Sequence, residues 1–108
     1  MTTPLCDFND LAESEARSFT VGKTDVFAVK HDNTVYIYEN SCPHLNINLE
    51  FLPNQFLDME KRFIQCSNHN ALFEIESGFC ISGPCHGKTL RKIPFEMSGQ
   101  KILIKQIL

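Results

Sequence analysis

Short apolar runs, several of them alternating with polar residues, make up most of the chain. They are rich in Phe, Ile, Val and Tyr, residue types that favour strands over helices. Residues that favour turns separate the runs, among them Gly22, Gly78 and Gly99. The pattern therefore predicts an all-β fold. The runs cover residues 19–21, 26–29, 35–38, 63–65, 72–75, 79–81, 90–97 and 102–105.

Two pairs of neighbouring runs predict β-hairpins. Residues 26–29 and 35–38 are joined by a short polar segment that begins at His31, and the last two runs meet around Ser98 and Gly99. The best candidate for a helix is the segment from Asp10 to Arg17, which we expect to form one or two turns near the N-terminus.

The segment from Ser41 to Gln65 does not follow the strand pattern. It is long, contains Pro53 and several asparagines, and has no clear hydrophobic period. Long irregular loops in compact domains are usually functional, so this segment is where we look first for a site.

Length and composition indicate one globular domain. The chain has 108 residues, of which 43% are hydrophobic and 10% aromatic, with nine Phe and no Trp. A chain of this size buries roughly two-thirds of the surface that its unfolded form exposes, which is enough for independent folding. Neither a repeat nor linker composition divides it, so we expect a single domain over residues 1–108.

Charge and the distribution of apolar residues argue against a nucleic-acid partner, a membrane span and a secretory signal. The formal net charge is -3, with acidic residues spread along the chain, and no basic patch of the kind that binds nucleic acid is visible. No stretch reaches the ~20 apolar residues of a membrane span. Residues 1–19 carry four acidic side chains where a secretory signal needs a basic and then an apolar region. We therefore expect a cytoplasmic protein.

The five cysteines are an odd number in a chain for which we expect no export. This argues against a disulfide framework and for metal binding or redox use of some of them. Two cysteines stand close to histidines, in Cys42-Pro-His44 and in Cys66-Ser-Asn-His69.

These two motifs together form a candidate metal centre. Thiolates paired with imidazoles suit zinc or iron, and one Cys and one His from each of two loops make a set of four ligands. Cys42, His44, Cys66 and His69 would fit a structural zinc ion. The same count of two Cys and two His is required by a [2Fe–2S] cluster in which imidazoles replace two thiolates on one iron.

The pair of motifs resembles the Rieske signature, and the chain is similar over nearly its whole length to the small Rieske ferredoxins of multicomponent oxygenases. The stretch from Tyr36 to Asn40, the run from Phe73 to Gly78, and Gly83 with Pro84 all stand where those ferredoxins have matching features. The resemblance implies a Rieske [2Fe–2S] fold, an antiparallel β-sandwich with a small cluster-binding subdomain whose loops lie within about residues 41–85.

By this resemblance one [2Fe–2S] cluster would be bound per chain. Cys42 and Cys66 would bind the inner iron, and His44 and His69 the outer, solvent-facing iron. Gly83 and Pro84 would form the third loop that covers the cluster. The sequence departs from the family pattern in the longer interval between His44 and Cys66 and in Ser67, which stands where the second motif more often has proline.

The resemblance also bears on the reduction potential. High-potential Rieske proteins have an additional disulfide between the cluster loops and hydroxyl groups that donate hydrogen bonds to cluster sulfur. The matching positions here hold residues that can do neither: Ile47, Asn68, Ala71 and Phe73. Hydrogen bonds to the sulfurs stabilise the reduced state, so their absence implies a potential near the roughly −150 mV end of the Rieske range.

The implied function is that of an electron carrier and not of an enzyme. Such a carrier would take one electron from a reductase and deliver it, by transient docking, to a terminal oxygenase of the aromatic-ring dioxygenase type. Two alternatives remain open: the small iron–sulfur subunit of an assimilatory nitrite reductase, which would dock with the large subunit, and a zinc-stabilised interaction module. The chain is too short to include, beside the cluster, a catalytic domain with its own mononuclear iron site.

The remaining cysteines have ordinary structural explanations. We expect Cys6 to be an inert residue of an N-terminal strand, Cys80 a buried strand thiol, and Cys85 a loop thiol.

Three other residues that could carry chemistry also have simple explanations. His31 falls in a predicted turn, where a histidine is usually solvated. Tyr36 and Tyr38 flank Ile37, and we expect one of these tyrosines to pack in the core and the other to face water.

Overall fold

The computed structural model describes residues 3–40, 57, 62–66, 71–83 and 87–105. Within these residues the chain forms strands and one 3₁₀ turn, which confirms the all-β prediction. The elements in chain order are β1 (Thr3–Asp7), η1 (Phe8–Asp10), β2 (Glu15–Val21), β3 (Thr24–His31), β4 (Thr34–Glu39), β5 (Phe63–Cys66), β6 (Ala71–Glu74), β7 (Cys80–Ser82), β8 (Phe95–Ser98) and β9 (Lys101–Ile104).

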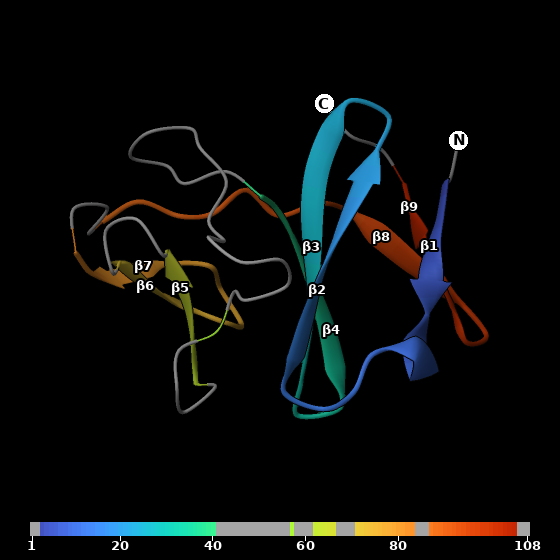
Figure 1. Cartoon of the computed structure of the whole chain (residues 1–108), viewed down its shortest axis with the longest axis horizontal. Helices are drawn as coiled ribbons and strands as arrows, with labels where there is room; N and C mark the ends of the chain where they lie inside the picture. Colours follow the sequence, from blue (N-terminus) through green and yellow to red (C-terminus); the bar gives the residue numbers. More distant parts are fainter. Residues whose placement is uncertain (1–2, 41–56, 58–61, 67–70, 84–86, 106–108) are drawn as a thin grey trace.

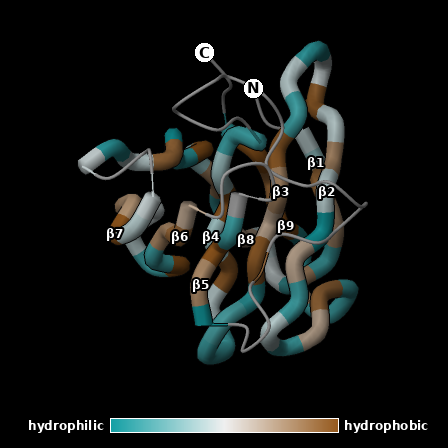
Figure 2. The backbone as a smooth tube through the Cα atoms, turned by 60° about the vertical axis from the view of Figure 1, so that its left-hand side comes forward, coloured by the Kyte–Doolittle hydropathy of each residue, from teal (hydrophilic) through white to brown (hydrophobic). Residues whose placement is uncertain are grey.

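Among the described residues, the strands form three antiparallel sheets of three strands each, ordered β1-β9-β8, β2-β3-β4 and β5-β6-β7. The sheet of β2, β3 and β4 lies in the middle of the molecule (Figure 1), with β8 and β9 on one side and β5 to β7 on the other. Hydrophobic residues line much of the strands, and hydrophilic residues mark several of the turns at their ends (Figure 2).

The central strand of the middle sheet, β3, is buried on both faces. On β3, Val26 and Ala28 belong to one hydrophobic cluster together with residues of β9, whereas Phe27 and Val29 belong to a second cluster together with residues of β6 and β7. Successive strand residues point to opposite faces, so a run of four apolar residues requires apolar neighbours on both sides. This explains why residues 26–29 are continuously apolar, with each of them fully buried.

Both predicted hairpins are present. β3 and β4 are joined by Asp32 and Asn33, whose positive φ angles of 53° and 60° are those of the tight two-residue turn that suits the twist of a hairpin. β8 and β9 are joined by Gly99 and Gln100, and Gly99 supplies a positive φ.

The predicted helix from Asp10 to Arg17 is wrong. Only residues 8–10 form a single 3₁₀ turn, and Glu15 to Arg17 begin β2, where they pair with residues 28–30 of β3. Ser14 has φ 59°, which no right-handed helix accommodates. Ala16 is buried in the hydrophobic cluster that contains Phe27, so the pairing with β3 and this burial outweigh the local preference for a helix.

The prediction for the two tyrosines is also wrong. Tyr36 and Tyr38 are two residues apart on a strand and therefore share one face, and both pack against the cluster that contains Phe27. Tyr38 is fully buried and Tyr36 partly buried.

Most of the long segment predicted before β5 lies outside the described residues, namely residues 41–56 and 58–61. Its one described residue before position 62, Leu57, pairs with Ile64 of β5.

The turn between β3 and β4 is held by a carboxylate from outside the hairpin. The two oxygens of Glu13 accept hydrogen bonds from the backbone N–H groups of Asn33 (3.0 Å) and Asp32 (2.7 Å). These two bonds, that of Asn33 first, lower the pKa of Glu13 from its ordinary value because they favour the ionised form.

We expect Glu13→Gln to lower the free energy of unfolding at pH 7 and to weaken its dependence on acid pH. Because the folded pKa lies below the unfolded value of about 4.3, the unfolded state binds more protons between the two values. The stabilisation is therefore complete above the unfolded pKa and is lost as the pH falls through the folded pKa. Urea unfolding of both proteins between pH 3 and pH 7 measures this difference.

Glu96→Gln provides the matched control, since Glu96 lies exposed on β8 and its carboxylate makes no hydrogen bond with any described residue. A Glu13→Gln difference that stays constant over this pH range, or that equals the difference for Glu96→Gln, would contradict the assignment.

Candidate metal centre

The second predicted motif begins at the end of a hairpin. β5 ends at Cys66, β6 begins at Ala71, and these two residues are paired across the hairpin. The connection between them is only residues 67–70. It contains His69, which lies outside the described residues. The main chain of Cys66 is therefore held by a regular antiparallel pair, directly before the segment that supplies the histidine.

A third segment packs against the turn end of this hairpin, at Ala71. A Cβ atom on Gly83 would lie 2.8 Å from the Cα of Ala71 and 3.1 Å from its Cβ, and the φ of Gly83 is +98°. Only glycine permits both this approach and this backbone conformation. Because Ala71 pairs with Cys66, the backbone of Gly83 packs against the residue pair at which the second motif begins. Pro84, the other residue of the predicted third loop, lies outside the described residues.

The chain enters the first predicted motif, residues 42–44, from an anchored strand end. The Glu39 N–H donates to the Arg91 carbonyl (2.9 Å), and the Glu39 carboxylate pairs with the Arg91 guanidinium (3.0 Å). The Asn40 N–H donates to the carbonyl of Asp25 (2.8 Å). Asn40 is buried, with 3% of its surface exposed. Residues 42–44 themselves lie outside that part of the chain.

Tyr38 connects the middle sheet to the sheet that carries Cys66. Its hydroxyl donates a hydrogen bond to the carbonyl of Ile75, directly after β6, and its ring lies 5.8 Å from that of Phe27 between centroids. Burial raises the pKa of Tyr38 well above its usual range, so the hydroxyl stays a neutral donor. Sequence reasoning missed this connection, although the spacing of two between Tyr36 and Tyr38 could have placed them on one face.

The four predicted ligands are not brought together within the described residues. Only the backbone of Cys66 belongs to them; Cys42, His44 and His69 do not. Elsewhere in the described part of the chain, no group of three or more His, Cys, Asp or Glu side chains could hold a metal ion. The set of four ligands therefore stays a prediction.

Two of the other cysteines are structural, as expected. Cys80 is buried in β7, and its thiol donates to the carbonyl of Ser82 (3.2 Å). Cys6 lies in β1, where burial, followed by the nearby carboxylate of Asp10, raises the pKa of its thiol. Both are free thiols, and a raised pKa keeps Cys6 protonated and unreactive at neutral pH. Cys85 lies outside the described residues.

His31 is not the solvated turn residue that we expected. It is the last residue of β3, and its Nε2 lies 3.4 Å from the Oε1 of Glu76 in the turn after β6. Its Nδ1 is buried, and no described residue gives it a hydrogen-bond partner. Together with Tyr38, it links the middle sheet to the turn between β6 and β7.

Comparison with known proteins identifies the family. A model of the Rieske [2Fe–2S] domain matches residues 1–103, almost the whole chain. The chain belongs to this family. Its cofactor is therefore a [2Fe–2S] cluster, which replaces the zinc alternative, and its fold is the Rieske fold.

Several relatives agree with this assignment. The chain is 29% identical over 100 residues to the ferredoxin component of the alkene monooxygenase system of Xanthobacter autotrophicus (strain ATCC BAA-1158 / Py2). The matched residues cover 93% of this chain and 77% of that protein. The ferredoxin of carbazole 1,9a-dioxygenase from Nocardioides aromaticivorans IC177 superposes with a TM-score of 0.77 at 22% identity, covering 96% of both chains. A complex of reduced oxygenase and oxidized ferredoxin in carbazole 1,9a-dioxygenase contains a chain that matches with a TM-score of 0.76 at 21% identity, covering 95% of this chain and 91% of that one.

The described residues fit a Rieske cluster. The backbones of Cys66, Ala71 and Gly83 meet at one end of the β5–β6 hairpin, and the sequence supplies the two thiols and two imidazoles that such a cluster requires. Within the described part of this Rieske chain, no helix has the length and apolar character needed to cross a membrane.

Proposed function

We propose that Cys42, His44, Cys66 and His69 hold the cluster, with the cysteines on the inner iron and the histidines on the outer one. The support is the count and type of donors, and the position of Cys66 at the end of a hairpin on which Gly83 packs. The anchored end of β4 would position the loop that contains Cys42 and His44. The segment that contains Gly83 would cover the loop that contains Cys66 and His69.

We further propose that the protein carries one electron at a time from a reductase to a terminal oxygenase and is not itself the catalyst. The observation that carries this proposal is the match to the ferredoxin component of an alkene monooxygenase system, over 93% of this chain and 77% of that protein. When bound, the cluster supplies a one-electron couple: two ferric ions, two sulfides and two thiolates sum to zero, and one added electron makes the site singly negative.

The named relatives favour an oxygenase as the electron acceptor over the large subunit of a nitrite reductase. One is a component of an alkene monooxygenase system, and the similar solved structures belong to carbazole 1,9a-dioxygenase. We therefore keep the terminal oxygenase as the proposed partner. Docking would be transient, because a carrier must leave the reductase before it meets the oxygenase.

Reconstitution tests this function. The protein purified without oxygen should contain two iron and two acid-labile sulfide ions per chain, a number that follows from its [2Fe–2S] cofactor. It should be reduced by the reduced form of the reductase of an alkene monooxygenase system and reoxidised by the oxygenase component in stopped-flow absorbance. Reoxidation by the large subunit of a nitrite reductase, but not by the oxygenase, would contradict the proposal.

We also propose that residues 1–108 act as one Rieske domain in the cytoplasm. The family match over residues 1–103 supports a single domain. The free thiols of Cys6 and Cys80 agree with a reducing compartment, in which structural disulfides are rare.

We expect a low midpoint potential, near the roughly −150 mV end of the Rieske range. Ala71 and Phe73 are both fully buried and offer no hydroxyl to cluster sulfur. Ala71→Ser should therefore raise the midpoint, because an added donor would stabilise the more negative reduced state. Protein-film voltammetry measures both potentials.

Ala28→Ser is the control, since Ala28 is equally buried but lies in the middle of β3. A strongly positive midpoint in the unmodified protein, or an equal shift in both variants, would refute this explanation of the potential.

A further inference from the structure

The two predicted ligand motifs leave different sheets. Residues 42–44 follow β4 of the middle sheet, whereas residues 66–69 join β5 to β6 in the neighbouring sheet. Among the described strands, no ladder of backbone hydrogen bonds joins these two sheets directly. A cluster with ligands on both loops requires a fixed distance between the loops, so other contacts must set that distance.

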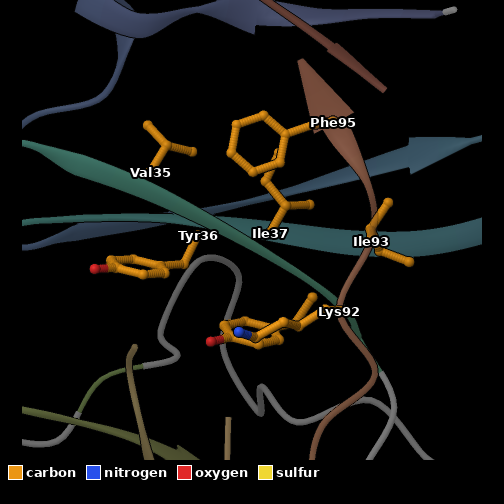
Figure 3. A pocket seen from close by; sticks show the side chains of 7 residues that line it. Val35, Tyr36, Ile37, Lys92, Ile93 and Phe95 are labelled. Carbon is orange, nitrogen blue, oxygen red and sulfur yellow. The ribbon is translucent and has the colours of Figure 1, made fainter. Parts of the chain in front are cut away.

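One backbone segment, between β7 and β8, bridges the two sheets. The Leu90 N–H donates to the Gly78 carbonyl (2.8 Å), and the Arg91 carbonyl accepts from the Glu39 N–H (2.9 Å). Figure 3 shows the continuation of this segment, at Ile93, beside β4. Within the described part of the chain, none of its backbone hydrogen bonds reaches β6, the strand that follows the second motif. A direct tie between β4 and the end of β6 must therefore come from a side chain.

Tyr38 makes this tie. It lies in β4, and its hydroxyl donates a hydrogen bond to the carbonyl of Ile75, the residue directly after β6. Its ring lies 5.8 Å from that of Phe27 between centroids, and a Cβ on Gly78 would come within 2.8 Å of its Cε1. The ring is thus packed against residues of both sheets, which limits the positions that the hydroxyl can take.

The hydrogen bond is buried, and its acceptor depends on it. Tyr38 is fully buried, and Ile75 is 1% exposed. Among the described residues, no backbone N–H donates to the Ile75 carbonyl. A buried carbonyl without a donor is costly, so the bond favours one distance between β4 and the end of β6. Because β4 leads into the first motif and β6 begins after the second, this distance also relates the two ligand loops.

We propose that Tyr38 is a positioning residue of the cluster, whose hydroxyl fixes the separation between the loop after β4 and the loop between β5 and β6. This role rests on the proposed ligand set, in which each of these loops supplies one Cys and one His. With the separation fixed, the thiolates and imidazoles meet the two irons in one geometry. Residues that orient the ligands of a metal without touching it tune its electronic properties.

Tyr38→Phe tests this role, because it keeps the ring and removes only the hydroxyl. In the holoprotein, we expect iron to be released to a chelator about fivefold faster, which corresponds to the loss of one hydrogen bond of roughly 1 kcal/mol. We also expect the EPR g values of the reduced cluster to change, because these values depend on ligand geometry. A loss of stability alone would speed the release of iron but leave the g values as they are.

Two control variants separate positioning from stability. Tyr36→Phe removes the same group from the same face of β4, where the Tyr36 hydroxyl makes no hydrogen bond with a described residue. It should leave both the release rate and the g values unchanged. Ile75→Val removes one buried methyl group but keeps the carbonyl to which Tyr38 donates. It should lower the unfolding temperature and leave the g values unchanged.

The positioning role would be overturned by an unchanged release rate or unchanged g values in Tyr38→Phe, or by the same change of g values in either control. None of these measurements uses a redox partner, so they do not depend on whether an oxygenase accepts the electron. An error in the ligand set would be detected separately, as a cluster that is retained in Cys66→Ala.

Discussion

Cys66→Ala is expected to yield a protein without the visible absorption of an iron–sulfur cluster. Cys66 ends β5 at the hairpin that carries His69, and alanine offers no thiolate to the iron. Because a cluster bound only by the folded state stabilises that state, the loss should also lower the unfolding temperature. Iron and acid-labile sulfide assays, together with visible absorbance, measure the outcome.

Cys6→Ala is the matched control. It also removes one thiol, but Cys6 lies in β1. There it packs against one hydrophobic cluster, whereas the buried residues of β5 and β6 belong to the other. This variant should keep the full cluster content of the unmodified protein. Retention of iron and sulfide by Cys66→Ala would show that another residue supplies this ligand.

Gly78→Ala is expected to destabilise the fold strongly, because it adds a steric clash to an unfavourable backbone conformation. A Cβ on Gly78 would lie 2.8 Å from Cε1 of Tyr38 and 3.3 Å from Cβ of Leu90, and its φ is +75°. The backbone conformation costs alanine about 1 kcal/mol, and forcing an extra carbon into a packed core costs about 2 kcal/mol more. The total of about 3 kcal/mol corresponds to a fall of roughly 15 °C in Tm for a domain of this length.

Gly99→Ala separates the two contributions. Gly99 has a similar φ of +63°, and a Cβ there would meet nothing within 4 Å. Only the conformational cost should remain, which predicts a fall of roughly 5 °C. Thermal unfolding of the holoproteins followed by circular dichroism measures both shifts, and equal shifts would mean that the contact with Tyr38 carries no strain.

The contact at Gly78 matters because of its place in the molecule. Tyr38 reaches from the middle sheet to the carbonyl of Ile75, and His31 reaches from the same sheet to Glu76. Both contacts hold the turn between β6 and β7, two elements of the sheet that carries Cys66. Substitutions at this turn therefore affect how the sheet of β5, β6 and β7 packs against the rest of the protein.

Local sequence was sufficient for the hairpins and for the family. The apolar runs around Asp32 and Asn33, and those around Gly99, each predict two strands and a tight turn within about a dozen residues, and the structure has them. The spacing of Cys and His in two short motifs pointed to the Rieske family, which the match over residues 1–103 confirms. Both patterns come from residues that are close together in the chain, so a single sequence is enough to detect them.

Other features were decided only when distant segments packed together. Residues 15–17 are a strand because β3 pairs with them, and Tyr38 is buried because the turn after β6 covers it. A periodic pattern reports which side chains share a face but not what covers that face, because the covering surface comes from residues far away in the chain.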